Sequence, residues 1–412
     1  MLSKSPAKGM RDFLPKEFAL RQQVLAIIQQ TYESYGFSRI ETPVVENIDL
    51  LTSKQGGDNE KLIFKILKRG EKLQTAAEDA LCDLGLRYDL TVPLARFYAN
   101  NVGQLPSVFK AMQMDSVYRA DRPQRGRYRQ FVQCDIDIIG EPANIAETEL
   151  ITATANALAN LGFNGLTVRL SDRRLLNAVA DKCGFDEKQK PSVFIALDKL
   201  DKIGVTGVMQ EVEEIAPGLA VPFIDMINRI TSSRNPFAAC VAELGEYLPD
   251  TVRRNIEEIL GVTGQTVKNG KVVFDITLVR GMGYYTGTIY EVTVDGLASA
   301  IAGGGRYDKM IGKIIGSDVP ACGFSIGFER IALLLQERGA SASKNCGIAV
   351  VIDKNTDIKT RVEVMQVCAQ LRKKQNVSVF TKIKNFGYQL KQLRETGYAV
   401  YEYKNGALTP IE

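Results

Sequence analysis

The sequence predicts an α+β protein, built from a largely antiparallel sheet flanked by helices, with a helical insertion and a small C-terminal α/β domain. Short strand-like segments dominate residues 38–141, and the pattern becomes helical from about 172 to 267. After residue 347, strands and helices alternate. The chain has 412 residues, 45% hydrophobic and 24% charged, which is enough for two or three domains that each bury a core.

The first predicted element is an amphipathic helix over residues 16–34. One face carries apolar or small side chains at helical spacing, and Gly36 ends the pattern. These side chains are Leu20, Val24, Ile27, Ile28 and Thr31. The segments that follow are strand-like and are separated by polar turns: SRIETPVVE, LIFKILK, SVFKAMQMDSVYRA and FVQCDIDIIGE. They favour an antiparallel sheet with helices packed against it.

A helical insertion is predicted between residues 172 and 267. The stretches RLLNAVADKCGF, VFIALDKLDKIG and VAELGEYL have helical patterns, and few convincing strands lie among them. Strand-like sequence returns in KVVFDITLV and TIYEVTVDG, so the sheet is expected to resume there. AIAGGGRYDKMIG and a helix over residues 327–338 complete a domain that we expect to span residues 1–338.

Residues 339–346, which are small and polar, are predicted to form a linker to the C-terminal domain at 347–412. That domain contains the strand-like GIAVVI, VSVF and YAVYEY, and a helix whose apolar face holds Val364, Val367, Cys368 and Leu371. It carries eight Lys and three Arg against two Asp and four Glu, a net charge of +5. Such a basic excess is typical of a small domain that contacts phosphates, and a Lys-rich solvated surface is the alternative.

The composition excludes several kinds of chemistry. Histidine is absent, which removes Ser-His triads, Cys-His dyads, HExxH zinc sites and an imidazole general base. The seven cysteines are scattered without CxxC spacing, so we expect neither disulfides nor protein-bound zinc. The N-terminus has no apolar core of a signal peptide, and no run of apolar residues is long enough for a membrane helix. A cytoplasmic protein without membrane association is therefore expected.

An arginine-rich segment, VYRADRPQRGRYRQFVQCDID, is the strongest functional signal. Its arginines are Arg119, Arg122, Arg125, Arg127 and Arg129. Guanidinium groups bind phosphate or carboxylate in a bidentate manner, and Gly126 allows a sharp bend between two strands. A polyanion site is favoured over a merely solvated basic hairpin. In the second strand, the period of two places Gln133, Asp135 and Asp137 on the same face.

Three glycine-containing segments complete the candidate site. RGMGYYTGT places Arg280 before glycines and before Tyr284 and Tyr285, although a turn with core aromatics would look similar. GGGRYD lacks the spacing of a dinucleotide fold or a P-loop, but a nucleotide could lie against its backbone. GFSIGFER leads into a helix with Arg330 in its first turns, where it could reach a triphosphate or form a surface salt bridge.

Taken in order, these segments resemble the signature motifs of class II aminoacyl-tRNA synthetases. YGFSRIETPVVE with Pro43, the segment around Arg119, and GFSIGFER are similar to the three class motifs. LRYDLTVPLAR, RGMGYYTGT, GGGRYD and KGMRDFLP resemble motifs of the histidyl-tRNA synthetase family in particular. The resemblance covers nearly the whole chain. It implies a class II synthetase-type sheet and a homodimer formed through the Pro43 motif.

The resemblance also implies an activity, in which histidine is activated with ATP to histidyl-adenylate and then transferred to the 3′ end of tRNA(His). Arg119 would bind the α-phosphate and the histidine carboxylate, and Arg330 would bind the far end of ATP. Arg280 would contact the α-phosphate and stabilise charge in a place where other class II enzymes use a metal ion. Arg280 and Arg119 are thus the implied catalytic residues. Further implied ATP contacts are Asp121, Arg127, Gly305 and Arg306, with Mg²⁺ accompanying the ATP.

The same resemblance assigns residues to histidine and to tRNA. The implied amino-acid contacts are Asp89, Thr91, Arg119, Gln133, Asp137, Tyr284 and Tyr285. Gln124 and Arg129 are implied contacts to the acceptor end of tRNA, and the C-terminal domain corresponds to an anticodon-binding domain.

The sequence departs from the family pattern in three places. Asp121 stands where Glu is usual, and Gly283 stands where Asp usually precedes the tyrosine pair. The C-terminal domain ends at YAVYEYKNGALTPIE and is interpreted as shortened by a helix and a strand. Two alternatives follow. One is a non-catalytic histidine-binding paralogue such as the regulatory subunit of ATP phosphoribosyltransferase, and the other is a paralogue that adenylates another amino acid or charges a carrier.

Overall fold

The computed structural model describes residues 4–52, 57–77, 80–279, 284–295, 299–340, 346–404 and 406–411. The chain divides into two compact units. The first comprises Met1–Phe13 and Arg21–Arg338, and the second comprises Leu14–Leu20 and Gly339–Glu412. Among the described residues, no helix is both long and apolar enough to cross a membrane.

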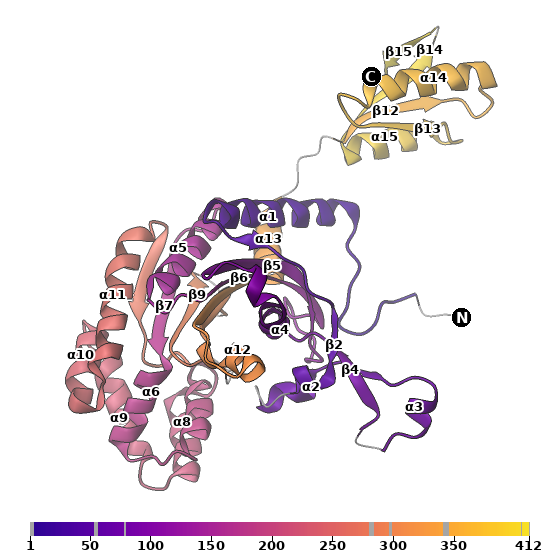
Figure 1. Ribbon diagram of the computed structural model, residues 1–412. Coiled ribbons are helices and arrows are strands. Elements are labelled where there is room, and N and C mark those ends of the chain that lie inside the picture. Colours follow the sequence, from indigo (N-terminus) through magenta and orange to yellow (C-terminus); the bar gives the residue numbers. More distant parts are fainter. Residues whose placement is uncertain are drawn as a thin grey trace. The chain divides into compact units, whose positions relative to one another are not determined.

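An eight-stranded sheet forms the centre of the first unit (Figure 1). Its order is β1 (Ser38–Arg39), β5 (Phe109–Tyr118), β6 (Gln130–Ile139), β11 (Ala321–Gly327), β10 (Ala302–Arg306), β9 (Thr288–Val294), β7 (Leu166–Asp172) and β8 (Gly270–Phe274). The six central strands are antiparallel, while β1 pairs with β5, and β8 with β7, in parallel. The predicted antiparallel sheet with flanking helices is confirmed.

Helices pack on both sides of this sheet. They are α1 (Pro15–Ser34), of which the part from Arg21 belongs to this unit, α4 (Thr91–Asn101), α5 (Ile145–Asn160), α12 (Asp308–Ile315) and α13 (Phe328–Glu337). Figure 1 shows α4 and α12 together inside the curve of the sheet, and α13 on the outer side. The side chains of α4, α12 and the ends of β5, β6 and β11 form one apolar cluster that also contains Tyr307. This cluster supports the floor of the cavity described below.

A smaller sheet and several short elements complete the first half of this unit. The sheet has the order β2 (Val45–Asn47), β4 (Cys82–Leu86) and β3 (Lys65–Leu67), and all of its pairs are antiparallel. The short helices are α2 (Ile48–Leu51) and α3 (Glu71–Gln74), with 3₁₀ helices at Gly57–Leu62, Val102–Gln104 and Gly245–Tyr247.

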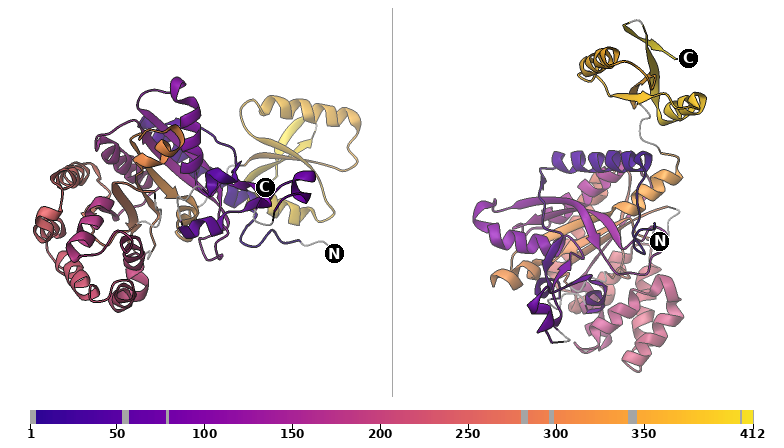
Figure 2. Two further views of the ribbon diagram at one scale, coloured as in Figure 1. Left: turned by 60° about the horizontal axis from the view of Figure 1, so that its bottom comes forward. Right: turned by 90° about the vertical axis from the view of Figure 1, so that its right-hand side faces the viewer.

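The helical insertion leaves the sheet at β7 and returns at β8, its parallel neighbour. It contains α6 (Arg173–Cys183), α7 (Lys190–Leu197), α8 (Leu200–Ile215), α9 (Ala220–Thr231), α10 (Pro236–Leu244) and α11 (Asp250–Thr266). Asp172 starts the first of these helices by accepting a hydrogen bond from the Arg174 amide, and Gly184 ends it in the left-handed conformation. Figure 2 shows these helices as a bundle beside the sheet.

The second unit contains a four-stranded sheet with the order β13 (Val377–Thr381), β12 (Gly347–Ile352), β14 (Tyr398–Lys404) and β15 (Ala407–Pro410). Helices α14 (Ile358–Leu371) and α15 (Phe386–Thr396) connect the parallel strands. Val364 and Cys368 of α14 are buried in one apolar cluster of this unit, as their helical spacing predicts. Strand β15 is formed by residues of the C-terminal stretch that departs from the family pattern. Most of the predicted linker, residues 341–345, lies outside the described residues.

Candidate active site

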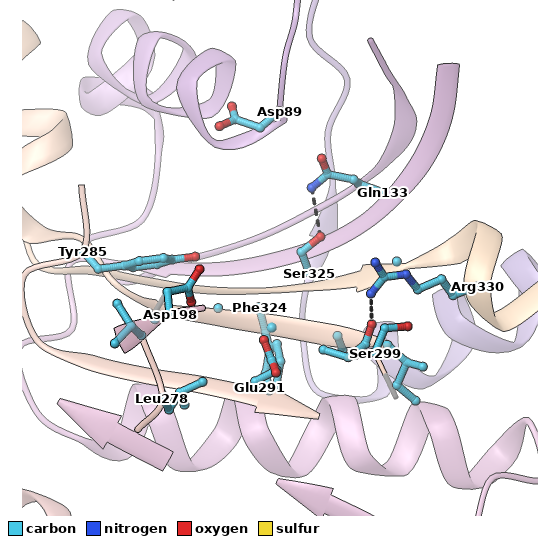
Figure 3. Close-up of a pocket in the computed structure, with 18 of the residues that line it drawn as sticks. Asp89, Gln133, Asp198, Leu278, Tyr285, Glu291, Ser299, Phe324, Ser325 and Arg330 are labelled. Carbon is cyan, nitrogen blue, oxygen red and sulfur yellow. Dashed lines mark hydrogen bonds between the residues drawn. The ribbon is translucent and has the colours of Figure 1, made fainter. Parts of the chain in front are cut away.

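A cavity of about 730 Å³ opens over the central sheet of the first unit. It is bounded by strands β6, β9, β10 and β11, the first turn of α4, the start of α13, and the loop between β5 and β6. Figure 3 shows side chains from these elements facing one another across it. The cavity brings together most of the residues that the sequence singled out: Asp89, Thr91, Arg119, Asp121, Arg127, Gln133, Asp137, Tyr284, Tyr285, Gly305 and Arg330.

Arg119 is fixed at the end of β5 by contacts on two sides. Its guanidinium carbon lies 4.3 Å from the ring centre of Tyr88 and 5.1 Å from that of Phe131. Its Nε donates to the Tyr88 carbonyl at 3.0 Å, and its Nη2 donates to Oε1 of Gln133 at 3.0 Å. Stacking and charge-assisted hydrogen bonds therefore hold the guanidinium plane before any anion is bound.

Residues 119–129, called the arginine loop below, form the turn between β5 and β6. Gln124 and Arg127 exchange backbone hydrogen bonds of 3.1 and 2.9 Å, and Gly126 between them has φ +72°. This left-handed conformation is the bend expected of that glycine. The tip lies close to α13, since a Cβ on Gly126 would be 3.5 Å from Leu333 Cδ2. Arg127 is exposed and lines the cavity.

Gln133 and Asp135 alternate along β6 and both face the cavity, as the period of two predicts. Gln133 Nε2 donates to Ser325 Oγ at 2.9 Å (Figure 3) and to the Asp135 carboxylate oxygens at 3.2 and 3.3 Å. The amide oxygen of Gln133 is consequently turned toward Arg119. Burial raises the pKa of Asp135 to about 7, although the hydrogen bonds from Ser325 and Gln133 act in the opposite direction.

Asp137 lies deeper on the same face and is only 3% exposed. The hydroxyl of Tyr307 donates to its Oδ1 at 2.5 Å. Burial, followed by the negative charge of Asp135, raises the pKa of Asp137 well above its usual value. Gly323 on β11 makes room for this carboxylate, because a Cβ there would be 1.9 Å from Asp137 Oδ1.

An aromatic wall stands beside Asp137. The ring centres of Tyr284 and Tyr285 are 4.8 Å apart, and Tyr284 meets Tyr307 edge-on at 6.1 Å. Burial raises the pKa of Tyr284 well above its usual value, so its hydroxyl stays protonated as a hydrogen-bond donor. Thr91 hydrogen-bonds Tyr284 from the first turn of α4.

Asp89 is held at the start of α4. Its Oδ1 accepts a hydrogen bond from the Val92 amide at 3.0 Å, and the residue is 4% exposed. Burial raises its pKa, and the Val92 amide opposes that effect. Asp89, Asp135 and Asp137 thus give the cavity three buried carboxyl groups close to the arginine at position 119.

The GGGR run is a strand of the central sheet, β10, and its glycines allow close approach of neighbouring strands. A Cβ on Gly304 would be 2.0 Å from the Gly323 carbonyl oxygen, and one on Gly305 would be 2.6 Å from that of Thr288. Gly305 lines the cavity, as its predicted ATP contact requires.

Arg306 lies elsewhere, which corrects the expectation that it faces ATP. Its Nε and Nη2 each donate to the buried carboxylate of Glu147 on α5 at 2.7 Å. Further donation goes to the carbonyls of Glu141 and Ala143 at 3.2 Å. Arg306 is not among the residues that line the cavity. A sheet strand alternates its side chains, so Arg306 points to the face opposite that of Gly305 and fastens α5 to the sheet.

Arg330 lies in the first turn of α13, where the sequence placed it, and lines the cavity. It donates to the carbonyl of Ala300. Its neighbour Glu329 forms a buried bidentate ion pair with Arg21, with N–O distances of 2.6 and 2.7 Å. This pair anchors the start of α13 and hence the base of the Arg330 side chain.

Several predicted residues are not part of the described cavity. Arg280 and Gly283 lie outside the described residues. Gln124 is at the exposed tip of the arginine loop, and Arg129 is at its base; neither lines the cavity.

Residues of the insertion also line the cavity, although none of them belongs to the predicted site. Leu197, Asp198, Leu200, Asp201 and Lys202, at the junction of α7 and α8, lie on the wall that faces β9. Arg169 on β7 connects them to the sheet, with N–O distances of 2.6 Å to Asp275, 3.7 Å to Glu291 and 3.8 Å to Asp201. No sequence signal marks this junction. In contrast, Ser325 and Tyr307 lie within GFSIGFER and GGGRYD and could have been found by strand alternation.

Comparison with known proteins identifies the family. The family model described as histidyl-tRNA synthetase matches residues 9–331. This chain belongs to the histidyl-tRNA synthetase family. A histidine–tRNA ligase of Leifsonia xyli is 47% identical over 354 residues, which cover 81% of this chain and 80% of the relative.

Two solved structures share the fold across nearly the whole chain. A histidyl-tRNA synthetase from Nostoc sp. PCC 7120 matches with a TM-score of 0.79 and 25% identity, covering 100% of this chain and 97% of that one. A protein from Bacillus halodurans, described as an ATP phosphoribosyltransferase regulatory subunit/histidyl-tRNA synthetase, matches with a TM-score of 0.76 and 19% identity, covering 97% and 98%. The second likeness shows the fold alone. As a member of the synthetase family, the chain has ATP as a substrate.

Proposed function

We propose that this chain activates histidine with ATP to histidyl-adenylate and transfers the histidyl group to the 3′ end of tRNA(His). One observation carries the proposal for this site. The guanidinium of Arg119, held between Tyr88 and Phe131, shares one cavity with the buried carboxylates of Asp89 and Asp137. A cation for phosphate and carboxylate, and two buried carboxyl groups that accept hydrogen bonds from the amino group and the imidazole, are the groups that adenylation of histidine requires.

The adenylation step needs charge stabilisation and alignment more than proton transfer. The histidine carboxylate is already ionised when it attacks the α-phosphorus of ATP, so no side-chain base is required. We assign both reacting groups to Arg119 and the departing pyrophosphate to Arg330 and Arg127; all three arginines line the cavity. Fixed positive groups aimed at developing charge are sufficient for such an in-line displacement. A chain without histidine can therefore perform this chemistry.

Arg280 completes this proposal as the second group on the α-phosphate, on the basis of its place in RGMGYYTGT. Asp121 and Gly305 are proposed to contact ATP from the arginine loop and from β10. Mg²⁺ is proposed to accompany the phosphates of ATP. Among the described ranges, no group of three or more Cys, Asp or Glu side chains is arranged to hold a metal ion.

Recognition of the histidine side chain is assigned to Asp137 and its neighbours. Tyr307 occupies Oδ1 of Asp137, and we assign Oδ2 to an imidazole N–H. Tyr284 and Tyr285 would enclose the ring, and Gln133 with Asp89 and Thr91 would bind its carboxylate and amino groups. An amino acid without a matching N–H would leave a buried carboxyl unpaired, which is costly in a desolvated site.

The proposal also includes contacts to tRNA and a dimer interface. Gln124 and Arg129 are proposed near the acceptor end, and the C-terminal unit with its net +5 charge near the anticodon. A homodimer through the Pro43 region is supported by the exposure of Val44 and Val45, of which 37% and 40% are accessible. A cytoplasmic location remains a prediction.

A non-catalytic histidine-binding paralogue would share the fold, as the Bacillus halodurans protein does at the level of structure. The phosphate-binding arginines distinguish the two functions, because a protein that only binds histidine has no use for Arg127 and Arg330. Both face the cavity here. This favours the catalytic function.

Pyrophosphate exchange with each of the twenty amino acids tests the proposal. We expect ATP–pyrophosphate exchange with histidine alone. Exchange with a different amino acid would indicate the adenylating paralogue, and no exchange combined with histidine binding would indicate the regulatory one. Aminoacylation of tRNA(His) then tests the second step.

A further inference from the structure

The N-terminal residues 8–13, called the N-terminal segment here, lie along the base of the arginine loop. The Arg129 amide donates to the Gly9 carbonyl at 2.8 Å, and Arg129 Nη1 donates to the Lys8 carbonyl at 3.5 Å. Arg129 Nε also donates to the Asp121 carbonyl at 3.1 Å. One arginine thus connects the segment to both sides of the loop.

Gly9 fits closely against the loop, and a side chain at this position would be strained. Its φ is +83°, which only glycine adopts without strain. A Cβ at this position would lie 2.8 Å from Arg129 Cγ and 2.9 Å from Pro123 Cγ. These distances are shorter than a van der Waals contact, so the segment would have to move away from the loop.

A ladder of alternating cations and aromatic rings continues from the loop through the segment to α13. Arg11 lies between Tyr128 and Phe13, at 5.5 and 4.8 Å from their ring centres, and its Nη1 donates to the Tyr128 hydroxyl at 3.2 Å. Arg21 lies between Phe13 and Phe328, at 3.9 and 4.7 Å. Each step is within the range of a cation–π interaction.

The far end of the ladder is anchored in the interior. Arg21 is paired with Glu329, and both residues are less than a tenth exposed. Oε1 of Glu329 also accepts a hydrogen bond from the Val132 amide of β6 at 3.2 Å. Phe328 and Glu329 directly precede Arg330. The ladder therefore joins the loop that carries Arg119 and Arg127 to the helix that carries Arg330.

We propose that the N-terminal segment is a positioning strap, in which Gly9, Arg11 and Phe13 hold the arginine loop at a fixed distance from the start of α13 so that arginines of both elements engage one ATP molecule. These residues do not touch the reacting atoms; they act through the loop. The strap acts on the ATP site of the proposed function and so rests on that function. The proposed histidine contacts Asp89, Asp137 and Tyr284 lie on other elements. Arg119, which is also assigned to the histidine carboxylate, is held directly by Tyr88 and Gln133. The strap should therefore affect ATP far more than histidine.

Steady-state pyrophosphate exchange with the full chain tests this asymmetry. Gly9→Ala is expected to raise the KM for ATP about tenfold or more and the KM for histidine by less than about twofold. Gly36→Ala is the matched control, because Gly36 has φ +80° and a Cβ added there would have no neighbouring atom within 4 Å. It carries the same backbone strain without the clash, and should leave both constants unchanged. An equal rise in both constants, or no difference between the two variants, would overturn the proposal.

Arg11→Ala gives the same test at an exposed position. It can therefore replace Gly9→Ala if that variant does not fold. It too should raise the KM for ATP selectively. Arg11→Lys keeps a cation over both rings and should restore part of the ATP affinity. If the lysine and alanine variants behave alike, the ladder has no positioning role.

A fluorescent reporter separates failure of the strap from failure of the proposed function. The chain has no tryptophan, so Tyr128→Trp places a single indole on the loop that can still stack on Arg11. Adding Gly9→Ala to this variant should lower the indole anisotropy, whereas adding Gly36→Ala should not. This readout needs no catalysis. Absence of exchange by the unsubstituted chain would refute the proposed function, and unchanged anisotropy would refute the strap.

Discussion

The two ends of the cavity are built in different ways. At the end proposed for histidine, Asp89 and Asp137 are 4% and 3% exposed; Asp89 accepts a hydrogen bond from the Val92 amide, and Asp137 accepts one from the Tyr307 hydroxyl. At the end proposed for the phosphates of ATP, Arg127 is exposed on a loop and Arg330 lies at the start of a helix. Buried and fixed groups discriminate because a wrong ligand leaves them unpaired, whereas exposed cations attract any polyphosphate. Selectivity among amino acids should therefore reside at the proposed histidine end, and the rate of turnover should depend on the proposed phosphate end.

Removing a cation from the α-phosphate is expected to have the largest effect. Arg280→Ala should reduce the rate of histidine-dependent pyrophosphate exchange by about 10³-fold, because its proposed charge stabilisation is greatest in the transition state. Histidine binding, measured by calorimetry, should remain largely intact. Arg254→Ala, a change at an exposed arginine of the insertion, is the control. Unchanged exchange would refute the role assigned to Arg280.

A change at the proposed histidine end should affect the KM for histidine far more than the KM for ATP. Asp137→Asn is expected to raise the KM for histidine about 100-fold, because an amide cannot replace a carboxylate as partner for both Tyr307 and the imidazole. The KM for ATP should change little. Tyr307→Phe, which keeps the carboxylate and removes one donor, should have a smaller effect in the same direction. If the ATP constant rises as much as the histidine constant, the two ends are not separate.

The carboxyl group of Asp135, which lies between the two ends, should make the stability of the chain depend on pH. The pKa of Asp135 is raised to about 7 in the folded chain, so the folded state holds this proton more tightly than the unfolded state does. Stability from this group is therefore present at low pH and is lost as pH rises toward 7. Between pH 5.5 and 7.5 the loss should be about 2 kcal/mol. Denaturant unfolding of the chain and of Asp135→Asn at both values measures it, and equal slopes with pH would contradict the assignment.

The smallest effect is expected at the exposed tip of the arginine loop. Arg127→Ala should raise the KM for ATP about fivefold at low salt and less at high salt, because a solvent-exposed cation is screened by counter-ions. The KM for histidine should not change. Exchange assays at two ionic strengths provide the comparison. An effect independent of salt would place Arg127 in a more desolvated contact than its exposure indicates.

The sequence identified residues that share the cavity where local pattern and chemistry coincide. Alternation along β6 was sufficient to place Gln133, Asp135 and Asp137 on one face, and the position of Gly126 was sufficient to predict the bend. The sequence did not identify a helix that is buried on all sides. Helix α5 was not singled out because its buried residues surround the helix axis instead of forming one stripe, and most of them are alanine, threonine or leucine.

Arg306 illustrates a second limit. Within GGGRYD, an arginine beside glycines is equally suited to a phosphate and to a buried carboxylate, and its partner Glu147 is 159 residues away in the chain. Only the packing of α5 on the sheet decides between them. The same holds for the α7–α8 junction, whose polar residues have no motif and reach the cavity because the insertion leaves the sheet between two paired strands.

By itself, the sequence determined the fold class, the helical insertion, the family and a set of candidate residues, most of which line the cavity. These depend on periodicity and on motifs that are local in the chain. The tertiary structure decided which of those side chains share a cavity, how Gln133 is oriented, and that residues 8–13 lie against the arginine loop. These properties depend on contacts between segments more than a hundred residues apart, such as that between Arg11 and Tyr128. Local pattern carries no information about such contacts.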